Sequence, residues 1–364
     1  MTQPKVILVL GAGATIGGGF EIQRDGRTFK PPTDRYFFDS EVVKDIFPPG
    51  ISTDRFPVLS HYRQGKELET LWAYVDLYHK LCRGGIISEE STFFNLADKI
   101  NKRAANDRAY RAKMEQESRI WVVPSMGGWE MLDLVKGIFT GLRHSEPTES
   151  PLYKLGKRLK DEDLLGGVIT FNYDMSLEIL FLDRFYYPLL PGQSISGRLP
   201  LLKLHGSLNW QFDTASDPPI FGMRDLTQVA DTDYQNQSRY KQPEIIGPTF
   251  FKQEINVDTQ LDPRGHFYKR LWAVAWDILR SADRLIFVGF SIPPTDFHAA
   301  ALFRTAHLSG RGFRRVVLCH YHDKCLRGTA EQVFATNSPE ISEFAEGLEN
   351  MAEHLDEVIG FLRS

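Results

Sequence analysis

The sequence predicts an α/β fold: a Rossmann-like, mostly parallel sheet with helices on both faces and a helical insertion or subdomain. The first observation is Lys5–Leu10, a nearly unbroken aliphatic run typical of a strand that is buried on both faces. The second is the clean alternation of helical and strand-like patterns between Phe267 and Cys319. The third is the glycine-rich or polar sequence that directly follows the predicted strands, where open α/β sheets bind ligands.

The remaining elements follow from hydrophobic periodicity along the chain. Further strands are expected at Gly167–Asn172, Leu201–Leu204, Arg284–Val288 and Arg314–Cys319. Helices of the sheet region are expected at Met175–Leu182, Phe267–Arg280, Asp296–Leu308 and Met351–Leu362. Helical patterns at Glu67–Cys82, Phe93–Arg119 and Met131–Arg143 predict a helical subdomain, whereas the polar segment before them is expected to be loop.

These elements predict one unit that spans residues 1–364. We expect its Rossmann-like core at about 1–40 and 165–325, its helical subdomain at about 60–160 and closing helices at about 326–364. The 43 basic and 47 acidic residues exclude a nucleic-acid binder that relies on bulk positive charge. For the same reason we expect no direct nucleic-acid contacts. No run reaches the roughly 18 apolar residues of a membrane span, and no signal peptide is recognised, so we expect a cytoplasmic protein without membrane contacts.

Small, polar or titratable residues follow four of the predicted strands. They are Gly11-Ala12-Gly13-Ala14-Thr15, Asn172-Tyr173-Asp174, His205-Gly206-Ser207 and Gly289-Phe290-Ser291. Because the carboxyl ends of parallel strands meet at one edge of a sheet, we expect these segments to form one ligand site.

The glycine-rich segment has two possible roles. Gly11 and Gly13 permit a tight turn and a close approach of backbone N–H groups to a phosphate. However, the spacing to Gly17 differs from the GxGxxG fingerprint of dehydrogenases, and no Gly-Lys-Ser/Thr follows as in a phosphate-binding P-loop. A dinucleotide phosphate site and a plain strand-to-loop turn therefore both stay open.

Three polar residues are candidates for chemistry. His205 ends an apolar strand, where it can act as a general base near neutral pH or be a structural histidine. Asn172 can hold a hydroxyl group or a water molecule, and Asp174 can either contact a ligand or cap the following helix. The cysteines and histidines of Cys319–Cys325 lack the spacing of a zinc finger, so no metal site is expected.

Taken in order, the segments GAGAT, TFNYD, LKLHGS and VGFS resemble the motifs of the sirtuin (SIR2-type) superfamily over about 1–35 and 165–325. The resemblance implies that Asn172, Asp174 and His205 are catalytic, with His205 as the base. It implies NAD contacts, with NAD as a substrate, from Gly11, Ala12, Gly13, Ala14, Thr15, Asn172, Tyr173, Asp174, His205, Gly289, Phe290 and Ser291. Asp34, which precedes Arg35, resembles the family's Asp-Phe-Arg loop more loosely, and this resemblance implies a further NAD contact from Asp34.

One departure narrows this resemblance. Protein-deacylating sirtuins carry a zinc ribbon with two CxxC pairs, and this chain has no cysteine between residues 83 and 318. It therefore looks like the bacterial sirtuin-like NAD hydrolases of antiphage defence, which release nicotinamide and ADP-ribose. That branch implies a homo-oligomer or a separate sensor subunit, such as a HerA-family ATPase or an Argonaute-type protein. The alternatives are an NAD-dependent deacylase or ADP-ribosyltransferase, and a non-catalytic sensor of NAD or ADP-ribose.

Overall fold

A computed structural model provides the structure of the chain. It describes residues 5–33, 36–47, 56–62, 68, 71, 99–108, 110–111, 114, 122–181, 184–188, 194–213, 220–223, 244–245, 263–293, 296–321 and 326–364. Two compact units are present. The first comprises Met1–Glu21, Leu142–Ser207 and Phe250–Ser364, and the second comprises Ile22–Gly141 and Leu208–Thr249.

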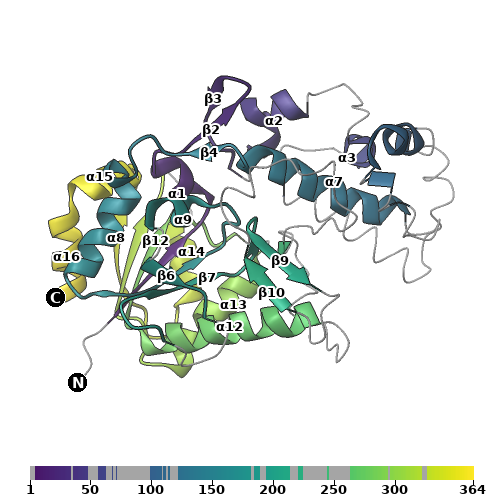
Figure 1. Cartoon of the computed structure of the whole chain (residues 1–364). Coiled ribbons are helices and arrows are strands. Elements are labelled where there is room, and N and C mark those ends of the chain that lie inside the picture. Colours follow the sequence, from purple (N-terminus) through teal and green to yellow (C-terminus); the bar gives the residue numbers. More distant parts are fainter. Residues whose placement is uncertain are drawn as a thin grey trace. The chain divides into compact units, whose positions relative to one another are not determined.

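A seven-stranded sheet forms the centre of the first unit (Figure 1). Its strands in spatial order are β14 (Glu340–Phe344), β13 (Arg315–Cys319), β12 (Arg284–Val288), β1 (Val6–Leu10), β5 (Leu165–Thr170), β7 (Leu199–Lys203) and β6 (Phe185–Tyr186). Every neighbouring pair is parallel. Without the short edge strand β6, this is the 3-2-1-4-5-6 order of the Rossmann fold, so the predicted fold class is confirmed.

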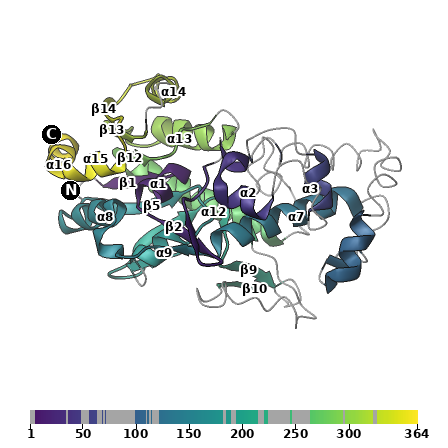
Figure 2. The same cartoon turned by 90° about the horizontal axis from the view of Figure 1, so that it is seen from above.

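Helices cover both faces of this sheet (Figures 1 and 2). One layer contains α1 (Ala12–Gly17), α8 (Pro151–Asp161), α15 (Leu348–Glu353) and α16 (Leu355–Arg363), and the other contains α12 (Pro263–Ser281), α13 (Phe297–Ser309) and α14 (Leu326–Val333). The short helix α9 (Ser176–Phe181) follows β5. Because both faces are covered, β1 is apolar throughout and β12 is apolar after Arg284, and every residue of these two strands is buried.

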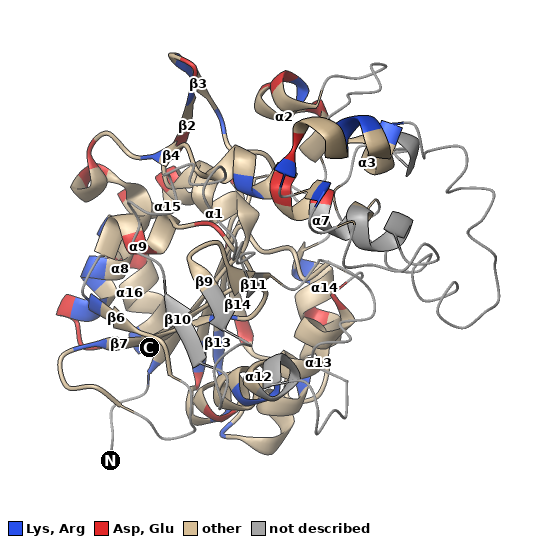
Figure 3. Cartoon of the chain, turned by 45° about the vertical axis from the view of Figure 1, so that its right-hand side comes forward, with Lys and Arg blue, Asp and Glu red and all other residues tan. Residues whose placement is uncertain are grey.

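The outer helices are amphipathic in the way this layering requires. In α8, Leu152, Leu155 and Leu159 are fully buried against the sheet side, while the lysines and arginines lie on the other face. Arg158 of α8 reaches Asp356 of α16 at 2.8 Å. Basic and acidic residues are interspersed along the described helices (Figure 3), in keeping with the near-neutral total charge.

The second unit begins with a hairpin where the sequence analysis expected loop. Strands β2 (Glu21–Arg24) and β3 (Arg27–Phe29) pair antiparallel. Asp25 and Gly26 connect them with φ of 48° and 74°. Two central residues with positive φ are typical of a type I′ turn, for which Asp-Gly is a preferred pair. The expectation of loop was therefore wrong here because the Asp-Gly signal was not used.

The other described elements of this unit are mostly helical. They are η1 (Phe37–Asp39), α2 (Glu41–Ile46), α3 (Pro57–Tyr62), α7 (Val122–Phe139), β9 (Trp210–Asp213), β10 (Ile220–Met223) and β11 (Glu244–Ile245). Both α2 and α3 pack against α7. The expected helix at Met131–Arg143 corresponds to the second half of α7, whereas the expected helix at Glu67–Cys82 lies almost entirely outside the described residues.

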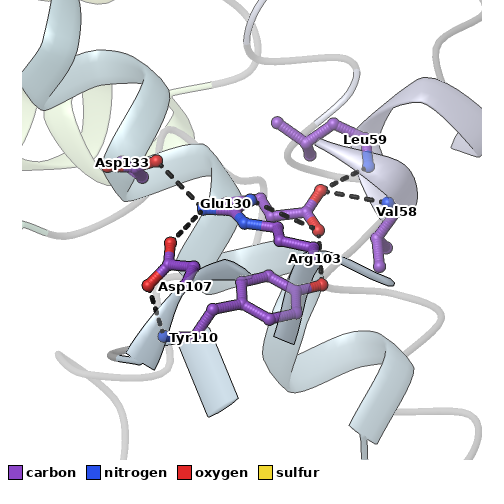
Figure 4. Close-up of polar contacts among 7 residues, drawn as sticks. All are labelled: Val58, Leu59, Arg103, Asp107, Tyr110, Glu130 and Asp133. Carbon is purple, nitrogen blue, oxygen red and sulfur yellow. Dashed lines mark hydrogen bonds and ion pairs between the residues drawn. The ribbon is translucent and has the colours of Figure 1, made fainter. Parts of the chain in front are cut away.

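A buried polar cluster ties α3 to α7 within the second unit (Figure 4). Glu130 of α7 has no exposed surface, and its Oε2 accepts the backbone N–H groups of Val58 and Leu59, each at 3.0 Å. Its Oε1 accepts the Tyr110 hydroxyl at 2.8 Å. Arg103 lies 3.8 Å from the same oxygen. The side chain of Glu130 therefore satisfies N–H groups in the first turn of α3, which have no partner inside the helix.

The end of the chain differs from the expected run of helices. Glu340–Phe344 forms the parallel edge strand β14 between two helices. None of its residues is fully buried, so its polar composition is typical of an edge strand rather than of the aliphatic central strands. The short elements β4 (Leu142–Arg143), η2 (Pro147–Glu149) and β8 (Gly206–Ser207) complete the first unit. Among the described helices, none combines the length and apolar character that a membrane crossing requires.

Candidate active site

The four segments predicted to form the site follow strands that are neighbours in the sheet. Spatially the strands run β12, β1, β5 and β7. Backbone hydrogen bonds continue past the strand ends, from Gly11 N to Val288 O (3.1 Å), from Phe171 N to Leu10 O (3.0 Å) and from Leu204 N to Thr170 O (2.9 Å). The residues that follow each strand therefore leave the same edge of the sheet together.

The glycines after β1 and β12 allow two loops to pack backbone against backbone. Gly289 has φ of +59°, and a Cβ there would lie 2.3 Å from Ala14 N. A Cβ on Gly11 would lie 2.5 Å from Gly289 O, and Gly13 N donates to the same oxygen at 3.1 Å. Glycine is thus required by packing at the point where the strand order reverses. A contact from this loop to a phosphate stays a prediction.

Thr15 joins the two polar residues that follow β5. Its hydroxyl donates to Asp174 Oδ2 at 2.7 Å, and Asn172 Nδ2 lies 3.2 Å from the same hydroxyl oxygen. Asn172 Nδ2 also donates to Gly11 O at 2.8 Å. Thr15 and Asp174 are 2% and 5% exposed, so this chain of hydrogen bonds is protected from water. The first and second motifs are therefore connected through side chains as well as through the sheet.

Asp174 also has the capping contact that the sequence analysis left open. Its Oδ1 accepts the backbone N–H of Ser176, the first residue of α9, at 2.9 Å. Both carboxylate oxygens thus hold protein donors, and each keeps a further lone pair. The arrangement fixes the direction of the carboxylate, whereas its contact with a ligand stays a prediction.

Lys203 donates a hydrogen bond to the backbone of Asp174 and was missed in the sequence analysis. Its side chain is 1% exposed at the end of β7, and Nζ donates to Asp174 O at 2.5 Å and to Glu178 Oε1 at 2.8 Å. Tyr187 donates its hydroxyl to the same Glu178 oxygen at 2.6 Å. A lysine inside the apolar run of β7 was the available signal, because an unpaired buried lysine is costly and such a residue has a partner.

His205 is buried and faces a carboxylate that the sequence analysis did not single out. Its Nε2 lies 3.1 Å from Asp296 Oδ2, and the two residues are 5% and 2% exposed. The other oxygen, Asp296 Oδ1, accepts the N–H of Ala299 at 3.2 Å and caps α13. The imidazole also meets the ring of Phe171 edge to face, with 5.1 Å between centroids. Because Phe171 directly precedes Asn172, this contact links the second and third motifs.

The other predicted site residues have varied environments. Phe290 is 6% exposed and stacks on Phe171 at 4.1 Å between ring centroids, so its side chain belongs to the core. Ser291 is exposed, while Ala12 and Tyr173 are half-buried. Asp34 lies outside the described residues.

The cysteine and histidine segment after β13 is only partly described. Burial raises the pKa of the Cys319 thiol to about 12, so this thiol is protonated at neutral pH. Residues 322–325, with His322 and Cys325, lie outside the described residues. Within the described part of the chain, no three Cys, His, Asp or Glu side chains gather in a metal-binding arrangement.

Comparison with known proteins gives distant structural similarity only. No family model matches the sequence, and no curated protein matches it. Among solved structures the chain is similar to Sir2Tm bound to a propionylated peptide, with 12% identity, 98% of this chain and 94% of that chain covered, and a TM-score of 0.42. It is also similar to a complex of Sir2 with a p53 peptide and NAD+, with 12% identity, 98% and 93% covered, and a TM-score of 0.41. At such values the likeness assigns neither family nor activity, and the fold assignment rests on the strand order.

Proposed function

We propose that the protein hydrolyses the nicotinamide–ribose bond of NAD to give nicotinamide and ADP-ribose. The observation that carries the proposal is the polar constellation at one edge of the sheet, where Asn172 and Asp174 are joined through Thr15 and a buried His205 follows the next strand. These are the positions that resemble sirtuin motifs, and the strand order is one that binds dinucleotides at this edge.

In this proposal the reversal point of the sheet holds the dinucleotide. The segments Gly11–Thr15 and Gly289–Ser291 follow β1 and β12, the two strands that flank this point. The amide side chain of Asn172 and the carboxylate of Asp174 hold the ribose hydroxyls and the carboxamide, respectively. Since Thr15 orients both groups, the ribose and the nicotinamide are presented in one geometry.

The chemical step needs one base and a neutral leaving group. The electron pair of the ribose C1′–N bond passes to the nicotinamide ring, which leaves without protonation. A water oxygen bonds to C1′ of the oxocarbenium-like ribose and gives a proton to His205. The proton then passes to solvent, so NAD and water yield nicotinamide, ADP-ribose and one proton.

The test is the consumption of NAD by the purified protein, with nicotinamide and ADP-ribose both quantified. We expect His205→Ala and Asn172→Ala each to lower turnover by at least about a hundredfold, the usual contribution of a general base or a positioned group. Full turnover in either folded variant would contradict its role. Binding of NAD or ADP-ribose without consumption, also in complex with a partner, would favour the sensor instead.

We further propose that the activity is triggered, as the resemblance to the antiphage branch implies. An effector that depletes NAD must be inactive until it is needed, so the trigger comes from self-assembly or from a separate subunit such as a HerA-family ATPase or an Argonaute-type protein. Turnover by the isolated chain across a concentration series, with its mass measured by light scattering, tests self-assembly. Activity that does not depend on either assembly or partner would refute the trigger.

A further inference from the structure

We propose that Asp296 is a positioning residue for His205, whose imidazolium it stabilises when the ring takes the proton of the attacking water. The inference rests on the proposed function for its catalytic consequence, while the pairing itself is a property of the fold. It assigns a role to a residue outside the four motifs.

The geometry restricts the imidazole from two sides. Nε2 lies 3.1 Å from Asp296 Oδ2, and the ring of Phe171 meets the imidazole edge to face. Phe171 is itself held by Phe290, which stacks on it with an interplanar angle of 5°. His205 follows β7 in one half of the sheet, whereas Asp296 lies beyond β12 in the other half. The pair therefore forms only when the strands from β7 to β12 are assembled side by side.

Burial makes the charge of Asp296 consequential. The residue is 2% exposed, and a carboxylate removed from water needs compensation from donors or a cation. A protonated His205 at this distance supplies a positive charge. The same attraction seen from the imidazole favours its protonated form, which a general base must form during the reaction.

Capping of α13 is the other role that Asp296 can have. The two carboxylate oxygens divide these roles, because Oδ1 accepts the N–H of Ala299 and Oδ2 faces His205. Asparagine caps helices about as well as aspartate, so Asp296→Asn keeps the cap acceptor and replaces the charged oxygen that faces His205 by a neutral NH2 group. Asp296→Ser, also a good cap, serves as the second variant if the amide disturbs the packing.

Asp283→Asn provides a matched control. Asp283 is 4% exposed, its Oδ2 lies 3.0 Å from Arg314 and its Oδ1 lies 3.9 Å from Arg284, so it is a buried carboxylate that also faces cations. It precedes β12 and therefore lies at the amino-terminal ends of the parallel strands, whereas His205 lies at their carboxyl ends. The same substitution there changes a buried charge without touching the candidate active site.

The experiment combines the ring titration of His205 with the pH profile of NAD turnover. Protein with ¹³C-labelled histidine is titrated by NMR, and His205→Gln identifies the resonance. We expect Asp296→Asn to lower the midpoint of this titration by at least about one pH unit, within the range that a neighbouring charge produces. The acid limb of kcat/KM should move by the same amount, and kcat should fall by about tenfold or more while KM changes little.

Each result decides the proposal. A titration midpoint within about 0.3 pH units of wild type in both Asp296 variants, or an equal shift in Asp283→Asn, overturns the pairing. If the wild type consumes NAD and the acid limb stays in place, the catalytic part is refuted. If the wild type consumes no NAD even with its partner, the proposed function and this catalytic part both fail, while the titration still decides the pairing.

Discussion

Replacement of Glu130 by glutamine tests how the buried cluster of the second unit responds to pH. Burial raises the pKa of Glu130 from 4.5 to about 8, against the opposing effect of Arg103. Between these values the folded protein holds a proton that the unfolded chain releases. The contribution of this raised Glu130 pKa to the free energy of unfolding is therefore complete below about pH 4.5 and is lost as the pH rises through 8.

The size of this effect follows from the shift. A difference of 3.5 pH units between 4.5 and 8 corresponds to about 5 kcal/mol in the free energy of unfolding, at about 1.4 kcal/mol per unit. Glutamine resembles the protonated acid in shape and cannot ionise, so Glu130→Gln removes this pH dependence. Arg103 keeps its charge partners in the variant, because its Nη2 lies 3.2 Å from Asp133 and 3.5 Å from Asp107 (Figure 4).

The assay is urea unfolding of wild type and variant from pH 5 to pH 9. We expect the wild type to lose about 4 kcal/mol relative to Glu130→Gln between pH 5 and pH 8, at about 1.4 kcal/mol per unit. Glu41→Gln changes an exposed glutamate of α2 and leaves Glu130 in place, so this control variant should keep the loss of stability between pH 5 and pH 8. Parallel curves for wild type and Glu130→Gln would refute the reasoning, since they would mean that Glu130 is already ionised at pH 5.

Three further substitutions test the packing and the polar contacts of the first unit. Gly289→Ala should destabilise the fold by at least about 2 kcal/mol in thermal unfolding, because of its positive φ and close backbone contacts; Gly360→Ala, in open space on α16, should be neutral or stabilising and serves as its control. Lys203→Met should cost about 3–5 kcal/mol in urea unfolding because it leaves Glu178 without its cation, and a loss below 1 kcal/mol would contradict the ion pair. Thr15→Val removes the hydroxyl between Asn172 and Asp174, so NAD turnover should fall by about tenfold while the variant still folds. Unchanged turnover would argue against a role for this hydroxyl in orienting the two residues.

The sheet could be predicted because its central strands have a recognisable local sequence pattern. Val6–Leu10 is apolar throughout and Arg284–Val288 is apolar after its first residue, as expected of strands covered on both faces, and the structure places both at the centre of the sheet. The edge strand Glu340–Phe344 was missed for the opposite reason. It is covered less, so selection for a continuous apolar run is absent and its sequence has no clear period.

The candidate site could be predicted only as a set of strand ends. Asn172, Asp174 and His205 were found because each directly follows a strand. Their supporting contacts come from Thr15, Lys203 and Asp296, which are 159, 29 and 91 positions away from the residues they touch. No local pattern reports such contacts, because they depend on which strands become neighbours and on where a connecting helix begins.

Lys203 and Asp296 are buried charged residues, and the sheet itself does not require charged side chains at these positions. A buried lysine and a buried carboxylate each carry a desolvation cost, and apolar side chains of similar volume would serve the sheet as well or better. Lys203 holds the backbone carbonyl of Asp174, and Asp296 faces the imidazole of His205. Both buried charged groups thus contact residues that the sequence motifs predict to be catalytic. If Asp174 and His205 have the proposed roles, these contacts hold the two side chains in the direction that those roles require.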